Sequence, residues 1–239
     1  MTTSSAPVTV TARERVTRLA ADHLTALQRG YLADQSHSVA SLARLRRGAG
    51  RQAGQLPDLW ALIDTGPLHQ TPTGARPLTE QELARAEDAL HVALTLYALH
   101  QQSRRTGMYQ ADRQDRRRGL GAAVRRMMKP GEIDAPVHKR LVRAGTAADL
   151  ATCAQRLRDI VVLLRREDIE LDHALLAGQL YTWQRPGGAA TVRREWGRSF
   201  HAWHDKPASP PHPAADRDTA DTTHTADTAV TTDTDKDAS

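Results

Sequence analysis

The sequence predicts an all-α fold, a helical bundle of about eight or nine helices with a disordered C-terminal tail. Apolar residues recur at the i, i+3 and i+4 spacing of an amphipathic helix almost throughout residues 11–204. No stretch alternates apolar and polar residues with the β-branched enrichment typical of strands. Caps and glycine stops separate the periodic segments, so the pattern divides into individual helices without internal repeats or sustained heptads.

The first two helices are marked by local start and stop signals. Thr11 can cap the first helix. The apolar stripe of that helix is Val16, Ala20, Leu24, Leu27 and Tyr31. A second helix is predicted from about Ser38 to Arg47, where Gly48 should stop it. After a glycine-rich stretch, a short turn is expected over residues 57–63.

The third helix should be the centre of the bundle. Thr79 and Glu82 have the spacing of a capping box, which should open the most apolar helix at about 80–102. Residues 89–100 of this segment are apolar around most of their circumference, as expected for a helix enclosed by others. The Arg-rich residues 103–118 that follow are predicted to form a loop.

Five further helices are expected in the second half of the chain, at about 120–129, 136–144, 147–166, 172–184 and 189–203. Thr146 and Asp172 are the expected caps, and Gly145 and Gly187 the expected stops. The last two helices carry apolar stripes, Leu176, Leu180 and Trp183 on one, and Val192, Trp196, Phe200 and Trp203 on the other. This spacing favours a buried core over exposed rings that stack on bases.

The composition divides the chain into three regions. A flexible N-terminus is expected over 1–10, an all-helical domain over 11–204, and a disordered acidic Thr/Asp/Ala/Pro tail over 205–239. Residues 207–239 contain no aromatic residue and only one large aliphatic side chain, Val230. Such a segment cannot bury enough apolar surface to offset the entropy cost of ordering.

The charge is distributed unevenly. The tail holds eight Asp against three Lys and Arg, so the remaining 204 residues carry 30 basic and 20 acidic groups, a net charge of +10. Arginine supplies 29 of the 33 basic residues, an excess that GC-rich coding can also produce. A basic body attracts polyanions, and the planar guanidinium group suits phosphate contacts.

Several classes of protein are disfavoured. No apolar run approaches the roughly 18 residues of a membrane helix, and the polar start lacks the apolar region of a signal peptide. The lone Cys153 excludes a disulfide framework and fits a reducing compartment. We therefore expect a soluble, cytoplasmic protein that does not contact a membrane.

No metal, cofactor or catalytic residue is predicted. His-Glu-x-x-His, Cys-x-x-Cys, a Gly-x-Ser-x-Gly elbow and a phosphate-binding glycine-rich loop are all absent. His201 and His204 are close in sequence, but the third candidate metal ligand, His212, falls in the tail. His91 and His100 should point to different faces of one helix, and His100 is expected to be half-buried with its hydrogen bonds satisfied. We therefore do not expect an enzyme.

Basic residues cluster near helix ends. The clusters are Arg44, Arg46 and Arg47; Arg104 and Arg105; Arg113, Arg116, Arg117 and Arg118; Arg125, Arg126 and Lys129; and Lys139, Arg140 and Arg143. A single cluster is most often a solvated helix face, and cations at helix C-termini also complement the helix dipole. So many clusters in a basic body make a phosphate-binding surface an equal alternative.

An ordered set of short strings resembles a known family. The strings are Leu42–Gly48, Tyr97–Gln102, Gly119–Gly121, Arg140–Ala144, Leu157–Val161, Leu163–Arg165, Leu180–Trp183 and Trp196–Phe200. Their order and spacing resemble the CasB family, the small subunit of the type I-E CRISPR surveillance complex Cascade. The resemblance covers about residues 12–204.

The resemblance implies a non-enzymatic, all-helical subunit of a crRNA-guided complex. The implied partners are the backbone and large subunits of Cascade, a second copy of this chain, the crRNA, and the target and non-target DNA strands. The implied function is to bind the crRNA–target DNA heteroduplex and the displaced strand through a basic surface, stabilising the R-loop in antiviral defence. Because R-loop formation is a near-balanced strand exchange, phosphate contacts that ignore sequence can tip it.

The family motifs carry over to individual residues. The predicted nucleic-acid contacts are Arg46 and Arg47 in the early basic motif, Arg104 and Arg105 after the His-Gln pair, Arg143 and Arg158 in the later basic helices, and Arg44, Lys139 and Arg140 from the same clusters. The family tends to carry a basic–aromatic pair before Arg140, whereas this chain has Val137 and His138. Lys139 can substitute for the basic member of that pair.

Two alternatives belong to other functional classes. A helical DNA-binding regulator outside CRISPR should show a compact helix-turn-helix of about 20 residues with one basic recognition helix. The basic clusters are instead spread over at least four segments, which favours a long surface that follows a nucleic-acid backbone. A metal-dependent hydrolase would need His-Asp pairs on buried helices, and the only such dipeptide, His204-Asp205, lies at the tail boundary.

Deleting residues 207–239 should leave the thermal unfolding midpoint unchanged, because the segment lacks apolar side chains to pack. Affinity for nucleic acid should be equal or slightly higher, because the tail is acidic. Thermal melts and binding titrations of the full and shortened chains check both points, and a clear drop in melting temperature would refute the assignment of the tail.

Overall fold

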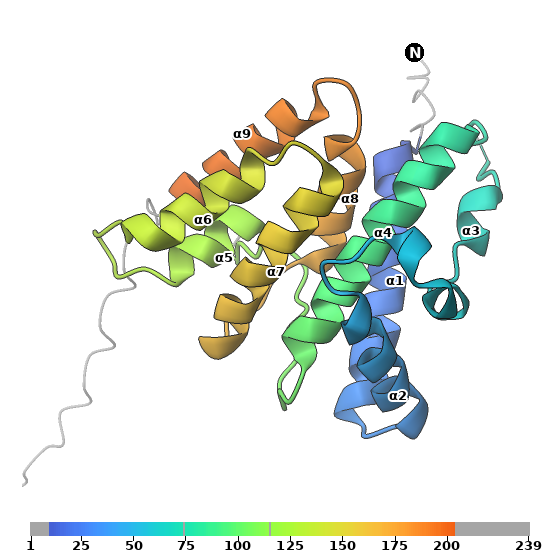
Figure 1. Cartoon of the computed structure of the whole chain (residues 1–239), viewed down its shortest axis with the longest axis horizontal. Helices are drawn as coiled ribbons and strands as arrows, with labels where there is room; N and C mark the ends of the chain where they lie inside the picture. Colours follow the sequence, from blue (N-terminus) through green and yellow to red (C-terminus); the bar gives the residue numbers. More distant parts are fainter. Residues whose placement is uncertain (1–9, 74, 115, 204–239) are drawn as a thin grey trace, which may run out of the picture. The chain divides into compact units, whose positions relative to one another are not determined.

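Helix α4 (Glu80–Gln101) is enclosed by neighbouring helices, while the helices of residues 120–145 and 188–202 lie beyond those neighbours (Figure 1). The structure, a computed structural model, describes residues 10–73, 75–114 and 116–203. Apart from Val10, the segment 1–10 expected to be flexible lies outside these residues, and so does the expected acidic tail, 205–239.

Helices account for all the regular structure of the described residues. In chain order they are α1 (Ala12–Leu32), α2 (Ser36–Leu45), the 3₁₀-helices η1 (Arg46–Gly48), η2 (Ala53–Gln55) and η3 (Pro57–Leu62), α3 (Gly66–His69), α4, α5 (Leu120–Arg126), α6 (Ala135–Gly145), α7 (Leu150–Arg166), α8 (His173–Trp183) and α9 (Gly188–Ala202). Within the described ranges the only β-type pairing is an isolated bridge between Tyr109 and Leu171. The all-α prediction is confirmed.

The central position of α4 follows from its sequence. Every residue from Ala89 to Gln101 is buried, so this part of the helix has no solvated face. Helices α1, α2, α7 and α8 and the 3₁₀-helix η1 all pack against it. A helix that is apolar around its circumference is stable only when other elements enclose it, which is the arrangement observed.

Three predicted caps form as expected. The Thr11 hydroxyl accepts a hydrogen bond from the Glu14 N–H and the Thr79 hydroxyl from the Glu82 N–H, each in a reciprocal capping box. Asp172 caps α8 by accepting from the N–H of Leu175 at 2.8 Å. These bonds satisfy amides that the first turn of a helix otherwise leaves without partners.

The predicted cap at Thr146 is wrong. Helix α7 begins at Leu150, and Asp149 caps it by accepting from the Thr152 N–H at 2.7 Å. The Thr146 hydroxyl instead donates back to the carbonyl oxygen of Val142 at 2.9 Å, at the end of α6. A carboxylate is the stronger acceptor at a helix N-terminus, because it also complements the helix dipole.

Three other boundaries differ from the prediction. Helix α2 begins at Ser36 rather than Ser38 and gives way to η1 at Arg46. Helix α5 ends at Arg126 rather than near Lys129, because Pro130 disfavours helical geometry in the residue before it. The four-residue helix α3 was not predicted, since a single turn carries no apolar period.

The aromatic side chains of α8 and α9 form a buried cluster, as predicted. The rings of Trp183 and Trp196 stack with centroids 5.9 Å apart, and Trp196 donates its indole N–H to Gln179 Oε1 at 2.8 Å. Val192 and Phe200 are buried on the same face of α9. Trp203 is only partly buried, and the Arg126 guanidinium lies 5.8 Å from its ring centroid.

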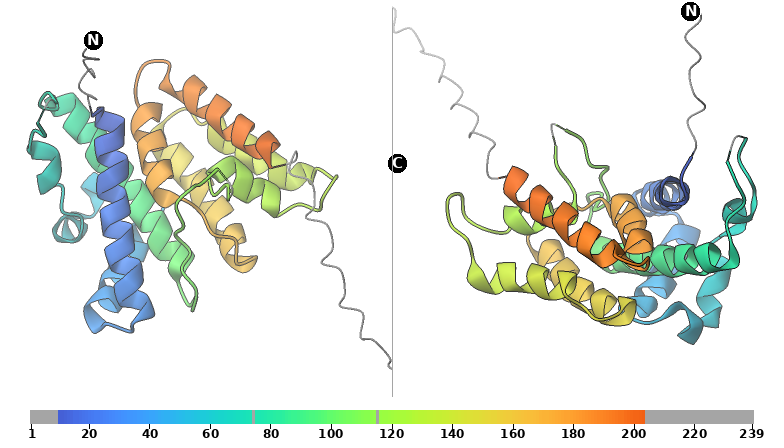
Figure 2. Two further views of the ribbon diagram at one scale, coloured as in Figure 1. Left: turned by 180° about the vertical axis from the view of Figure 1, so that it is seen from behind. Right: turned by 90° about the horizontal axis from the view of Figure 1, so that it is seen from above.

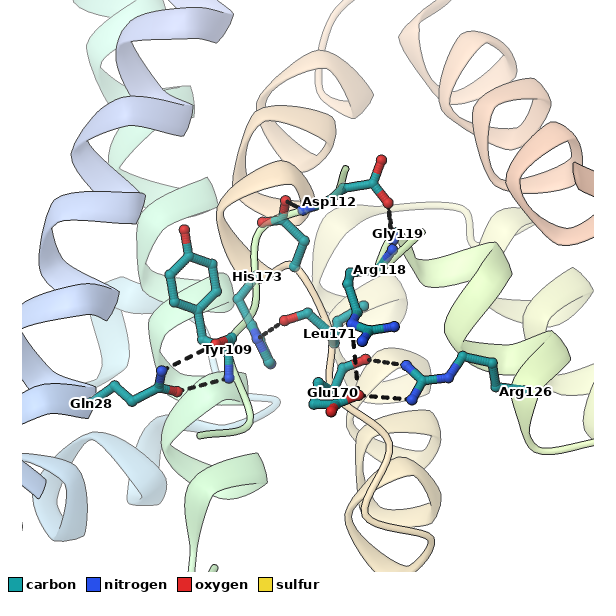
Figure 3. Close-up of polar contacts among 10 residues, drawn as sticks. Gln28, Tyr109, Asp112, Arg118, Gly119, Arg126, Glu170, Leu171 and His173 are labelled. Atoms are coloured by element: carbon teal, nitrogen blue, oxygen red, sulfur yellow. Dashed lines mark hydrogen bonds and ion pairs between the residues drawn. The ribbon is translucent and has the colours of Figure 1, made fainter. Parts of the chain in front are cut away.

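Polar contacts hold the loop 103–118 in place (Figure 3). The Gln28 side chain donates to the Tyr109 carbonyl oxygen at 3.1 Å and accepts from the Tyr109 N–H at 2.9 Å. The Asp112 N–H donates to Asp172 Oδ2 at 2.7 Å, which ties the loop to the start of α8. The predicted loop is therefore present, and side chains of α1 and the α8 cap fix its path.

His100 of α4 and His173 of α8 form a buried pair. Their ring centroids are 5.2 Å apart, and both side chains are fully buried. Neither ring nitrogen of His100 has a hydrogen-bond partner of ordinary geometry among the described residues, so the expectation of a half-buried, satisfied histidine is wrong. The ring lies under α8, a contact that the sequence of α4 alone does not reveal.

Trp196→Ala should lower the free energy of unfolding by about 3–5 kcal/mol, the range for removing a large buried aromatic side chain. Trp60 is 65% exposed and provides the control, because Trp60→Ala should change stability by less than about 0.5 kcal/mol. Urea unfolding measures both. A Trp196→Ala variant of normal stability that loses single-strand binding would show that the ring is an exposed stacking platform.

The histidine pair should make the fold sensitive to acid. Burial lowers the pKa of His100 to about 3. The Ile169 backbone opposes this shift, and the positive charge of Arg165 adds to it. Burial also lowers the pKa of His173 well below its ordinary value. Both imidazole rings are neutral in the folded state, and each has a pKa near 6.5 in the unfolded chain. The stability that depends on these histidines is therefore complete above pH 6.5 and falls below it. His100 accounts for a loss of about 2 kcal/mol at pH 5, and His173 adds a loss in the same direction.

Urea unfolding at pH 7 and pH 5 measures this loss, and His100→Phe removes one of the two titrating groups. The variant should lose about half as much stability as the wild type between the two pH values. Equal losses in the two proteins would show that other groups cause the acid sensitivity.

Candidate nucleic-acid interface

Most of the predicted contact residues lie on four neighbouring elements. They are Arg44, Arg46 and Arg47 on α2 and η1, Arg158 on α7, and Lys139, Arg140 and Arg143 on α6. We call these seven residues the basic face. Helices α4 and α7 pack together, η1 packs on α4, and α6 packs on α7. Seen from above, α6, α7 and the α2–η3 segment lie along one side and α1 on the opposite side (Figure 2, right).

Asp58 of η3 positions the arginines at the end of α2. Arg44 donates to the Asp58 carbonyl oxygen at 2.8 Å, and Arg47 forms an ion pair with the Asp58 carboxylate at 3.1 Å. The Arg47 and Asp58 side chains are 62% and 50% exposed, so the pair is worth little and leaves Arg47 available to another anion. Arg46 is half-buried and forms no ion pair within the described ranges.

At Gly50 the chain after η1 passes close to the Arg158 side chain on α7. Gly50 has a φ of +81°, the left-handed region that favours glycine. A Cβ at this position would lie 3.2 Å from the Arg158 Cδ and 3.0 Å from the Gln155 side chain, which donates to the Gly50 carbonyl oxygen. Arg158 therefore lies beside the segment that carries Arg46 and Arg47, although more than a hundred residues separate them in sequence.

Helix α6 extends the basic face beyond α7. Leu141 and Ala144 are buried, and Lys139, Arg140 and Arg143 are exposed. A side-chain N–H of Arg156, on α7, donates to the Arg143 carbonyl oxygen and joins the two helices.

The Val137–His138 position does not provide a basic–aromatic pair at the surface. Both residues are only partly exposed, and the His138 ring packs with its centroid 5.3 Å from that of Phe200. The exposed Lys139 is the basic side chain available at this position.

Arg104 and Arg105 lie apart from the basic face, beyond the C-terminal end of α4. Arg104 forms an ion pair with Asp168 at 2.8 Å, after the end of α7, and its side chain is 28% exposed. Arg105 is exposed. The structure therefore separates this predicted pair from the other seven residues.

Several other predicted basic residues are part of the interior. Arg118 and Arg125 are buried, although their clusters suggested solvated surfaces. Glu170 forms ion pairs with Arg126 at 2.7 Å and with Arg118 at 3.7 Å (Figure 3). Burial lowers the pKa of Arg118, because the charged guanidinium loses hydration, and the negative charge of Glu170 partly offsets this loss. These arginines stabilise the loop 103–118 rather than a ligand surface.

Three further residues, Asp58, Gln155 and Arg51, shape the basic face and were not predicted from the sequence. Asp58 and Gln155 act through hydrogen bonds to distant chain segments, which no local pattern reveals. Arg51 is exposed directly after Gly50 and extends the face. Arg51 could have been predicted from the sequence, because it follows Arg47 by four residues and continues the same basic segment.

The arrangement suits phosphate binding. Guanidinium and ammonium groups on several elements can follow a chain of phosphates without reading bases. Within residues 10–73, 75–114 and 116–203, no cluster of three or more His, Cys, Asp or Glu could hold a metal ion. Burial raises the pKa of Cys153 to about 12, so it is not an activated thiolate. No described helix is long and apolar enough to cross a membrane.

Known proteins resemble this chain in both sequence and fold. The sequence profile of the CRISPR-associated protein Cse2 family matches residues 41–201. The crystal structure of CasB from Thermobifida fusca is similar at 47% identity and a TM-score of 0.68, over 78% of this chain and 98% of that chain. A chain of a CRISPR RNA-guided surveillance complex matches at 19% identity and a TM-score of 0.57, over 79% and 95%, which supports the fold alone. No curated protein sequence matches.

Proposed function

Because the chain belongs to the CRISPR-associated protein Cse2 family, we propose that it is the non-enzymatic small subunit of a type I-E CRISPR Cascade complex. Its role there is to hold the crRNA–target DNA heteroduplex and the displaced DNA strand through the basic face, stabilising the R-loop. The observation that carries this proposal is the position of Arg158 beside the segment of Arg46 and Arg47, which joins distant clusters into one surface.

The physical basis is an exchange of strands that is close to balanced. The heteroduplex that forms is about as stable as the DNA duplex it replaces, so a modest gain from phosphate contacts shifts the equilibrium. Contacts of this kind need exposed cations and no base-reading groups. The basic face supplies such cations from η1, α7 and α6, whose spacing is fixed by packing on α4 and on one another.

The nine predicted residues are not equivalent under this proposal. The seven residues of the basic face are the main contacts. Arg104 is held by Asp168 and would have to exchange a carboxylate for a phosphate, so Arg104 and Arg105 form a secondary contact.

The proposed partners are the backbone and large Cascade subunits, a second copy of this chain, the crRNA and both DNA strands, in the cytoplasm. A regulator with one recognition helix is not favoured, because the residues of the basic face occupy four separate elements.

Replacing Arg46 and Arg47 with Ala should weaken binding in a way that depends on salt. If Arg46, Arg47, Lys139, Arg140 and Arg143 each contact one phosphate of a single strand, these contacts, about five in all, give a slope of log K against log salt near −3.5, so affinity should fall about a hundredfold between 50 and 200 mM salt. The double variant should flatten that slope by a little over one unit. In an assembled complex it should shorten the R-loop lifetime and leave crRNA loading intact.

The matched control is the double variant Arg18→Ala and Arg29→Ala, which removes the same charge from exposed positions on α1, on the opposite side. A salt titration of the R-loop lifetime compares the three proteins. If the Arg46/Arg47 variant has the wild-type slope, those arginines are only a solvated helix end. If both double variants flatten the slope equally, net charge rather than the basic face determines binding.

A further inference from the structure

A second basic site lies at the ends of three helices, away from the basic face. A cavity of about 760 Å³ opens between the N-terminus of α1, the segment that leads into α4 and the C-terminus of α8. These three helix ends meet at the top of Figure 1. The volume is within the range of small-molecule sites, about 300–1,000 Å³. Its wall includes four arginines, Arg13, Arg15, Arg76 and Arg185.

Two of these arginines are fixed by carboxylates. Arg13 donates to both oxygens of Glu195, at 2.7 and 2.8 Å, and Glu195 also accepts from Gln179 at 3.0 Å. Arg76 forms a two-point pair with Glu82, the residue that closes the capping box of α4. Both guanidinium groups are therefore held in place and largely neutralised.

The other two arginines have no carboxylate partner in the described part of the chain. Arg15 is buried and donates to the carbonyl oxygens of Leu68 and Gln70, each at 2.6 Å, which orients the group without cancelling its charge. Arg185 is exposed at the end of α8. Among the lining residues four arginines face one carboxylate, Glu82. Glu195 pairs with Arg13 and Glu14 binds Thr11 at the start of α1, so an excess of positive charge remains around the cavity.

Tyr181 places a neutral donor among these charges. Its side chain is 1% exposed and lines the cavity. Burial and the Glu82 carboxylate raise the pKa of Tyr181, against the opposing effect of Arg185, Arg85 and Arg76, so the hydroxyl keeps its proton at neutral pH. A protonated phenol can donate a hydrogen bond to a ligand in the cavity.

We propose that this cavity binds the terminal phosphate of a nucleotide, either free or at the end of a nucleic-acid strand. A phosphate monoester carries close to two negative charges at neutral pH, which complement the excess of positive charge around the cavity. Arg185 and the Tyr181 hydroxyl are the donors for its oxygens. Val10, Ala75 and Leu78 form an apolar part of the wall, against which a base or sugar can pack.

This proposal does not rest on the function proposed for the basic face, because the two sites share no residue. An acidic peptide could also satisfy the excess charge. The apolar wall and the Tyr181 hydroxyl favour a compact phosphate group joined to a flat, weakly polar body. Peptide binding is therefore an outcome that the experiment must exclude.

Isothermal titration of the full chain with adenosine monophosphate tests the site. We expect saturable binding with a dissociation constant below about 1 mM, and at least tenfold weaker binding of adenosine, which lacks the phosphate. Arg185→Gln should weaken nucleotide binding about tenfold, and Tyr181→Phe, which keeps the ring, about threefold. Arg29→Gln, at an exposed position near the far end of α1, is the matched control and should bind like the wild type.

Competition experiments identify the source of the phosphate. If a 5′-phosphorylated oligonucleotide displaces adenosine monophosphate and the same oligonucleotide without the phosphate does not, the site takes a strand end. If neither displaces it, the site takes a free nucleotide. The proposal is refuted if adenosine monophosphate does not bind, if an acidic peptide binds at the cavity in its place, or if Arg29→Gln weakens binding as much as Arg185→Gln.

Discussion

The enclosure of α4 is the constraint on which the rest of the structure depends. Every residue from Ala89 to Gln101 is buried, so the helix must be surrounded, and α1, α2, α7, α8 and η1 do so. The enclosure also has a cost. Both ring nitrogens of His100 and Nε2 of His173 are buried in it without a hydrogen-bond partner of ordinary geometry among the described residues, and this burial is tolerated only because the rings stay neutral.

The same constraint assembles the basic face. Gly48 lies so close to α4 that a Cβ there would come within 2.7 Å of Thr95, which holds η1 against the helix. Helix α7 packs on α4 from its own side and is joined to the η1 segment through Gln155 and Gly50. Arginines that lie far apart in sequence therefore reach one surface because their helices share a buried neighbour. Under the proposed function, affinity for a polyanion depends on this packing as well as on the composition.

Local signals predicted much of this fold, and non-local contacts account for what they missed. The capping boxes at Thr11 and Thr79 and the stripe through Val192, Trp196 and Phe200 could be predicted, because each depends on residues within one or two turns. The buried Arg118 and the position of Arg158 could not. An arginine in a basic string is solvated or internal according to whether a distant carboxylate, here Glu170, lies within reach.

Site-specific crosslinking in an assembled Cascade complex tests the central claim most directly. A photoreactive amino acid would replace Arg158, where α7 meets the η1 segment, and in a second protein Arg29 on α1. With labelled crRNA and target DNA, we predict adducts to nucleic acid from position 158 that increase when the R-loop forms, and none from position 29. Adducts from position 158 to protein subunits alone, or equal nucleic-acid adducts from both positions, would contradict a phosphate-binding role for the basic face.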